Sequence, residues 1–174
     1  MEQKIVAYID AANLHRGSRD LGFDIDYKKF YGWLCQKYNL SKIYLFLGFL
    51  PWHQKEYDHF EECGYYLIFK ETITSKRGET KGNCNAELIL KSASDYYEKN
   101  FDSCIIISGD GDFKCLIDFL NEKNCIKAVL CPVKSKSSYL IRKVKIPVIF
   151  LDDHYHKFLK VLETEKAPDA DVSA

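Results

Sequence analysis

The chain has 174 residues, and its content of 47% hydrophobic and 29% charged residues is enough for one domain with an ordinary core. Lysine and arginine together number 25, as do aspartate and glutamate, so nucleic-acid binding has to use a local basic patch rather than an overall positive charge. Apolar runs are too short for a transmembrane helix, and the N-terminus lacks the apolar stretch of a signal peptide. We therefore expect a cytoplasmic protein that does not bind membranes.

Predicted strands and helices alternate along the chain. Strands are expected at Ile5–Ile9, Ile43–Leu47, Tyr65–Phe69, Ser103–Ser108, Lys127–Leu130 and Val148–Leu151. Helices are expected at Tyr27–Tyr38, His53–Cys63, Ala86–Glu98, Phe113–Asn124 and Asp153–Leu162. Such alternation produces right-handed crossovers between parallel strands, and continuous apolar runs indicate strands that are buried on both faces. The predicted fold class is therefore α/β, with helices on both faces of a mainly parallel central sheet.

Two polar segments interrupt this alternation. Residues 72–83 contain glycine and several basic residues, and we expect them to form a mobile loop. Residues 164–174 are small and polar, and we expect them to form a disordered tail. The sequence thus predicts one domain over residues 1–163 and a tail after it.

The seven cysteines are odd in number, and no two of them have the CxxC spacing. This pattern is typical of free, buried thiols in a reducing cytoplasm. The paired ligand spacings of a zinc site are absent.

Acidic residues follow two of the predicted strands. Asp10 ends the first strand, and residues 108–113, with the sequence SGDGDF, follow the strand that begins at Ser103. The glycines allow a sharp turn and leave space beside Asp110 and Asp112. Because the carboxyl ends of parallel strands meet at one edge of a sheet, we expect Asp10, Asp110 and Asp112 to form one cluster there. Clustered carboxylates repel each other, so the pattern favours a bound divalent cation.

Helix capping is an alternative role for each of these polar residues. Asp112 is placed to cap a helix that begins at Phe113, and Asp10 or Asn13 could cap the helix after the first strand. A dinucleotide-binding loop is disfavoured, because Lys114 stands where the third glycine of that motif is required.

Asn85 is a further polar candidate. It lies one helical turn before Ile89 on the same helix face, so its amide is expected to point toward the sheet, at the rim of the acidic cluster. The alternative role for Asn83 or Asn85 is again a helix cap.

Basic residues precede this helix, namely Lys70, Lys76, Arg77 and Lys81. Charged loops are commonly just solvated. Beside a divalent metal, however, Arg77 and Lys81 would suit a phosphodiester backbone.

Three blocks of the sequence resemble the NYN domain family of PIN-like nucleases. They are residues 10–13 (DAAN), residues 81–88 (KGNCNAEL) and residues 108–113 (SGDGDF), in the family's order, and the likeness extends roughly from Lys4 to Leu151. The resemblance implies a PIN-like three-layer α/β/α fold and a carboxylate cluster that binds Mg²⁺ or Mn²⁺ and cleaves RNA. It assigns Asp10, Asp110 and Asp112 as metal ligands, and Asn13 and Ser108 as supporting polar groups on the substrate side.

The chain departs from this family at two places. Asn85 stands where the family normally has aspartate, so one negative charge is missing. Two unit charges about 4 Å apart interact by about 4 kcal/mol at an effective dielectric of 20, so its loss weakens metal binding. Residues 144–147 (VKIP) stand where the family often has an Ala-Asp pair.

These expectations combine into a metal-dependent endoribonuclease that hydrolyses RNA phosphodiester bonds with Asp10, Asp110, Asp112 and Asn85 at its centre. Single-stranded or structured RNA is the expected partner, and a homodimer is left open. Two alternatives stay open. One is a catalytically weak or inactive RNA-binding module, which Asn85 favours. The other is a nuclease that acts on single-stranded DNA, since nothing in the sequence identifies a reader of the 2′-hydroxyl.

Overall fold

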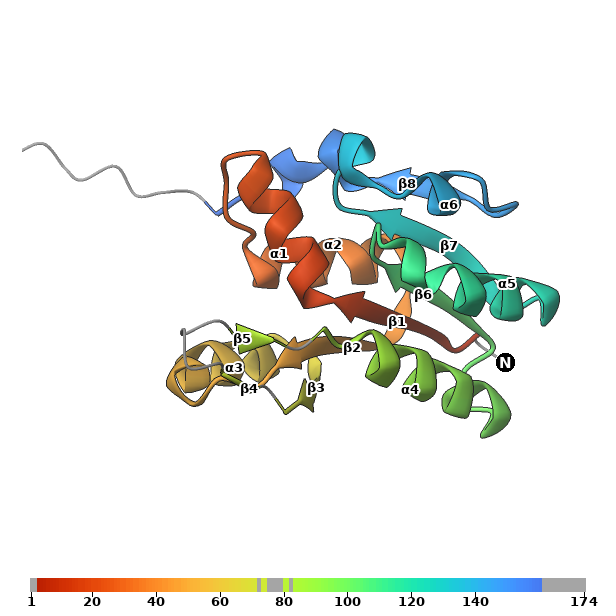
Figure 1. Cartoon of the computed structure of the whole chain (residues 1–174), viewed down its shortest axis with the longest axis horizontal. Helices are drawn as coiled ribbons and strands as arrows, with labels where there is room; N and C mark the ends of the chain where they lie inside the picture. The colour runs from red at the N-terminus through yellow and green to blue at the C-terminus, as the bar shows by residue number, and fades with distance from the viewer. Residues whose placement is uncertain (1–2, 72, 75–79, 82, 161–174) are drawn as a thin grey trace, which may run out of the picture.

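The computed structural model describes residues 3–71, 73–74, 80–81 and 83–160. Its centre is a six-stranded sheet in the order β3-β2-β1-β6-β7-β8, and all five strand pairings are parallel (Figure 1). The strands are β1 (Ile5–Asp10), β2 (Leu40–Gly48), β3 (Tyr66–Lys70), β6 (Ser103–Ile107), β7 (Ile126–Cys131) and β8 (Val148–Phe150). The six strands expected from the sequence are thus confirmed, with small differences at their ends.

The central strands are buried along their whole length, as their uninterrupted apolar sequences predict. Successive residues of β1 contribute to two separate clusters of buried side chains. Ala7 and Ile9 belong to one cluster, and Val6 and Tyr8 belong to the other. A sheet with an apolar cluster on each face needs a helix layer on each side.

Six α-helices lie in the described part of the chain. They are α1 (Ala11–Asp20), α2 (Tyr27–Tyr38), α3 (Gln54–Glu62), α4 (Asn85–Tyr97), α5 (Lys114–Glu122) and α6 (Tyr139–Arg142). Side chains of α1, α2 and α3 belong to the cluster around Ile9, whereas those of α4 and α5 belong to the cluster around Tyr8. This confirms the α/β/α layering that the sequence predicted. No helix among the described residues is long and apolar enough to cross a membrane.

The predicted helix Asp153–Leu162 is wrong over its described part, up to residue 160. The chain instead forms two short 3₁₀ turns, Leu151–Asp153 and Tyr155–Lys157. Phe158 is fully buried against Phe30 and Trp33 of α2, with ring centroids 4.8 and 5.3 Å away. Backbone groups there bond across the chain to residues 24–26 instead of to the next turn. These long-range partners replace the hydrogen bonds that an α-helix would need.

The predicted loop 72–83 falls mostly outside the described residues. Within it, β4 (Ile73–Thr74) and β5 (Thr80–Lys81) form a short antiparallel pair that the sequence did not indicate. The predicted tail 164–174 lies outside the described residues altogether.

The strand order places a topological switch point beside β1. From β1 the chain moves outward through β2 to β3, and it then returns to form β6 on the other side of β1. The connections that leave the carboxyl ends of β1 and β6 therefore start in opposite directions, which opens a crevice between them.

Candidate active site

Pairing of β1 with β6 brings the two acidic blocks together. Ile9 lies opposite Ile107 in the parallel register, so Asp10 and Ser108 emerge as neighbours at the carboxyl edge. The Ser108 hydroxyl donates a hydrogen bond to Oδ2 of Asp10 over 3.1 Å. The prediction that both blocks meet at one edge of the sheet is confirmed.

Asp10 lies behind this edge and is only 5% exposed. Its Oδ1 accepts the Asn13 N–H over 3.1 Å, which makes Asp10 the N-cap of α1. Burial raises the pKa of the Asp10 carboxyl, and the nearby charge of Asp110 adds to this increase. Hydrogen bonds from Asn13 and Ser108 and the charge of Arg16 act in the opposite direction. Asp10 is thus both a helix cap and a buried acid at the site.

The turn after β6 presents two acids in different ways. Oδ1 of Asp110 accepts the Asp112 N–H over 3.0 Å and caps the 3₁₀ turn Gly111–Phe113, which leads into α5. The alternative in which Asp112 caps a helix that begins at Phe113 is therefore wrong. A 3₁₀ turn precedes α5, and Asp110 is the residue that caps this turn. Asp112, by contrast, is exposed.

Asn85 reaches Asp112 from the start of α4. Its Nδ2 donates a hydrogen bond to Oδ2 of Asp112 over 3.1 Å, and the residue is 8% exposed. Asn85 does not cap α4, because Cys84 occupies the N-cap position without a side-chain hydrogen bond. The expected location of Asn85 at the rim of the acidic turn is confirmed.

Asn13 and Ser108 hold the turn in place. Oδ1 of Asn13 accepts the Gly109 N–H over 2.9 Å, and the Ser108 hydroxyl accepts the Asp110 N–H over 3.2 Å. Ser108 is only 1% exposed, and its hydroxyl is bonded to Asp10 and to the Asp110 N–H, so its expected role on the substrate side stays a prediction. Asn13 is partly exposed and borders an open pocket.

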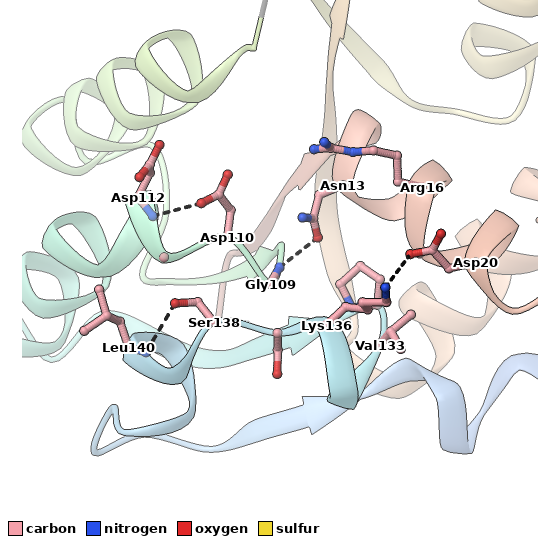
Figure 2. Close-up of a pocket in the computed structure, with 14 residues that line it drawn as sticks. Asn13, Arg16, Asp20, Gly109, Asp110, Asp112, Val133, Lys136, Ser138 and Leu140 are labelled. Carbon is pink, nitrogen blue, oxygen red and sulfur yellow. Dashed lines mark hydrogen bonds and ion pairs between the residues drawn. The ribbon is translucent and has the colours of Figure 1, made fainter.

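The pocket has a volume of about 580 Å³ and runs from the acidic turn along α1. Figure 2 shows the carboxylates of Asp110 and Asp112 pointing to the same side of the turn, with Arg16 across from them on α1. Residues 132–140, which follow β7, supply the third wall. Sequence reasoning missed Arg16, although it lies one helical turn after Asn13, and it missed this third wall.

The basic residues expected beside the site are less well placed. Arg77 lies outside the described residues, and only the backbone of Lys81 is described, in β5. Lys70 forms an ion pair with Glu87 of α4 over 3.3 Å. Its charge is therefore partly neutralised within the protein.

Comparison with known proteins identifies the family. The NYN domain model matches residues 4–152, which include every acid of the site. The chain belongs to the NYN domain family. This nuclease-like, PIN-like family is the one that the three sequence blocks indicated.

A crystal structure of a protein of unknown function from Vibrio parahaemolyticus RIMD 2210633 matches the NYN domain with a TM-score of 0.75 and 21% identity, over 91% of this chain and 97% of that chain. It supports the fold alone. No curated protein sequence matches the chain significantly.

The acidic turn of the NYN domain fits a divalent cation in part. The expected convergence of Asp10, Asp110 and Asp112 is not met, because no three acidic, histidine or cysteine side chains in the described part of the chain lie close enough to hold an ion. Asp10 is buried and hydrogen-bonded behind the turn. Asp110 and Asp112 remain as partly or fully exposed oxygen donors. Mg²⁺ commonly uses one or two carboxylates together with water and substrate phosphates, so this pair is a suitable donor set.

Proposed function

We propose that this NYN domain is a metal-dependent endoribonuclease that hydrolyses RNA phosphodiester bonds at the turn after β6. The observation that carries this proposal is the pair of accessible carboxylates, Asp110 and Asp112, at the mouth of an open pocket on the carboxyl edge of the sheet. The choice of RNA rests on the family resemblance.

Asp110 and Asp112 would hold a Mg²⁺ or Mn²⁺ ion. Such an ion activates water and offsets the negative charge that develops on the phosphate. Asn85 orients Asp112 through its amide hydrogen bond. Asn13 and Ser108 fix the turn through the backbone N–H groups of Gly109 and Asp110, so both carboxylates are held in place before substrate binds.

A catalytically weak RNA-binding module is the second candidate. It is favoured by the neutral Asn85, whose amide occupies one oxygen of Asp112. An aspartate at this position would instead offer a further ligand. RNA binding without cleavage would distinguish this function from the first.

Cleavage assays on labelled single-stranded RNA and DNA with Mn²⁺, Mg²⁺ or EDTA test the proposal. We expect metal-dependent cleavage of RNA that Asp112→Asn lowers by about 100-fold or more, because a metal ligand and a charge are lost. The melting temperature of this variant should change little, since Asp112 is exposed.

Asp118→Asn is the matched control, because Asp118 is an exposed acid of α5 that pairs with Lys114. It should cleave like the wild type. Full activity in a folded Asp112→Asn protein would show that the catalytic centre lies elsewhere. Faster cleavage of the single-stranded DNA than of the RNA would show that DNA is the substrate.

A further inference from the structure

The connection between β7 and β8 carries a local excess of positive charge. We call residues 134–145 the basic connection. It contains five basic residues and no acid, and all five basic side chains are exposed: Lys134, Lys136, Arg142, Lys143 and Lys145. Because the whole chain has no net charge, this segment is a distinct basic patch.

The basic connection lies directly against the acidic turn. The Ser138 N–H donates to the Gly109 carbonyl oxygen over 2.8 Å. A Cβ atom at Gly111 would lie 2.5 Å from Oγ of Ser138, so any larger residue there would require the Ser138 side chain to move. Lys136, Ser138 and Leu140 line the same pocket as Asp110 and Asp112 (Figure 2).

Most of this positive charge is not neutralised by the protein. Among the described residues, only Lys136 of the five has a carboxylate partner, Asp20, at 4.0 Å and in an exposed position. Such an exposed pair is weak and separates easily when a stronger anion binds. Arg142 and Lys145 thus present their charge to the solvent, on the part of the basic connection that follows the pocket-lining residue Leu140.

An exposed aromatic ring lies within the basic connection. Tyr139 is 59% exposed, and Nζ of Lys143 lies 4.3 Å from its ring centroid. Its neighbour Leu140 is 50% exposed and lines the pocket. A basic track combined with an exposed aromatic ring is the usual means of binding single-stranded nucleic acid, in which the backbone meets cations and an unpaired base stacks on the ring.

We propose that the basic connection binds the backbone of a single-stranded nucleic acid where it leaves the acidic turn, with Tyr139 stacking against one base. This inference rests on the proposed function for the choice of a nucleic acid as the ligand. It adds the route by which the strand leaves the acidic turn and the requirement that the nucleic acid be single-stranded. A duplex keeps its bases paired and stacked, so it could not use Tyr139 in this way.

A second exposed aromatic group defines the alternative route. Phe49 and Trp52 follow β2 at the same edge of the sheet, and Trp52 is 68% exposed. A strand that leaves over β2 would contact Trp52 instead of Tyr139. Trp52→Ala is therefore included as a comparison.

The binding test uses fluorescence anisotropy with a fluorescein-labelled 20-nucleotide single-stranded RNA in EDTA, so that binding is measured without cleavage. The double variant Arg142→Gln/Lys143→Gln should raise Kd by about tenfold at low salt. It should also reduce the slope of log K against log salt by about 1.4, that is, by about 0.7 for each lost phosphate contact.

Lys28→Gln/Lys127→Gln is the charge-matched control. Both lysines are exposed, in α2 and at the start of β7, and they lie outside the basic connection. This control should bind RNA like the wild type. Tyr139→Ala should raise Kd for the single strand by about 5- to 100-fold and leave the affinity for a duplex unchanged.

Three outcomes would overturn the inference: equal weakening by both double variants, weakening by Trp52→Ala without any effect of the basic-connection variants, or no binding of the single strand by the wild type. Cleavage with Mn²⁺ is measured separately. Binding that depends on the basic connection, without cleavage, would refute the nuclease proposal and leave this inference standing. Cleavage by the wild type, together with unchanged RNA binding by the basic-connection variants, would support the nuclease proposal and refute this inference.

Discussion

At the scale of single residues, Asn85 controls the charge of the acidic turn. It donates an amide hydrogen bond to a carboxylate oxygen of Asp112 over 3.1 Å. An aspartate at position 85 would place two carboxylates at about this separation, and they would repel each other unless a cation lay between them. The neutral amide therefore stabilises the metal-free turn and limits its affinity for a cation.

Asn85→Asp is expected to lower the melting temperature without metal and to raise it more than in the wild type when Mn²⁺ is added. The metal-free loss should be about 1 kcal/mol, or about 2–4 °C for a chain of this size. The gain follows because an added anion strengthens cation binding, and binding to the folded state stabilises it. Thermal shift measurements over a Mn²⁺ titration test both parts.

Asn83→Asp adds the same charge two residues earlier, at an exposed position before α4. Its Mn²⁺-dependent shift should match that of the wild type. Equal shifts for all three proteins would place Asn85 outside the cation site, despite its contact with Asp112.

At the scale of elements, the pocket depends on how closely α1 approaches the end of β7. Gly17 of α1 faces Pro132, and a Cβ at Gly17 would lie 2.6 Å from the Pro132 Cβ. The proline ring cannot rotate away, so any larger residue pushes the two segments apart. Because α1 carries Asn13 and the segment after β7 carries the basic connection, this contact sets the width of the pocket.

Gly17→Ala should therefore lower the free energy of unfolding, although alanine favours helix formation by about 1 kcal/mol over glycine. Overpacking costs about 1–3 kcal/mol, so we expect a net loss of up to about 2 kcal/mol. Gly32→Ala in α2 is the matched control, since nothing lies within 4 Å of its added Cβ. That variant should be more stable than the wild type by about 0.5–1 kcal/mol. Urea denaturation of both variants tests the opposite signs; stabilisation of both would show that α1 shifts freely.

At the scale of the whole molecule, a buried charge network joins α4 to the sheet. Asp95 is 1% exposed, and its carboxylate accepts hydrogen bonds from Tyr8 of β1 over 2.8 Å, from Lys91 over 2.6 Å and from Asn100 over 2.8 Å. Burial alone would raise the pKa of Asp95, but these three hydrogen bonds and the charge of Lys91 together lower it. The network fixes the helix that delivers Asn85 to the site.

Asp95→Asn should lower the free energy of unfolding by about 2–4 kcal/mol at pH 7, because charge-assisted hydrogen bonds are lost in a buried position. The pKa of Asp95 is lowered in the folded state. The wild type is therefore more stable than Asp95→Asn by the full difference in free energy of unfolding above the unfolded-state pKa of about 3.9, and this difference declines as the pH falls through the folded-state pKa. Urea titrations between pH 2 and 7 measure this. Asp118→Asn should show a far smaller difference, because its ion pair is exposed. If the difference in free energy of unfolding between Asp95→Asn and the wild type stayed constant down to pH 2, the loss would come from altered side-chain packing and not from the lost charge of Asp95.

The sequence by itself determined the layered α/β fold, the bounds of α2, the order of the parallel strands along the chain and the meeting of Asp10 with the turn after β6. These features follow from local patterns. Apolar periodicity identifies a strand or a helix, and parallel pairing then brings the carboxyl ends of strands to one edge. Glycine beside aspartate after a buried strand marked the turn.

Only the tertiary structure decided which acid caps the turn after β6, that Ser108 is buried, that residues 153–160 form no α-helix and that the basic connection lines the pocket. Each depends on contacts between distant segments, such as the bond of Ser138 to Gly109 or the packing of Phe158 on α2. A hydrogen bond to a distant partner replaces a local one whenever folding brings that partner close. A local sequence pattern cannot predict which partner is chosen, because the distant partner comes within reach only after the sheet and helices have packed.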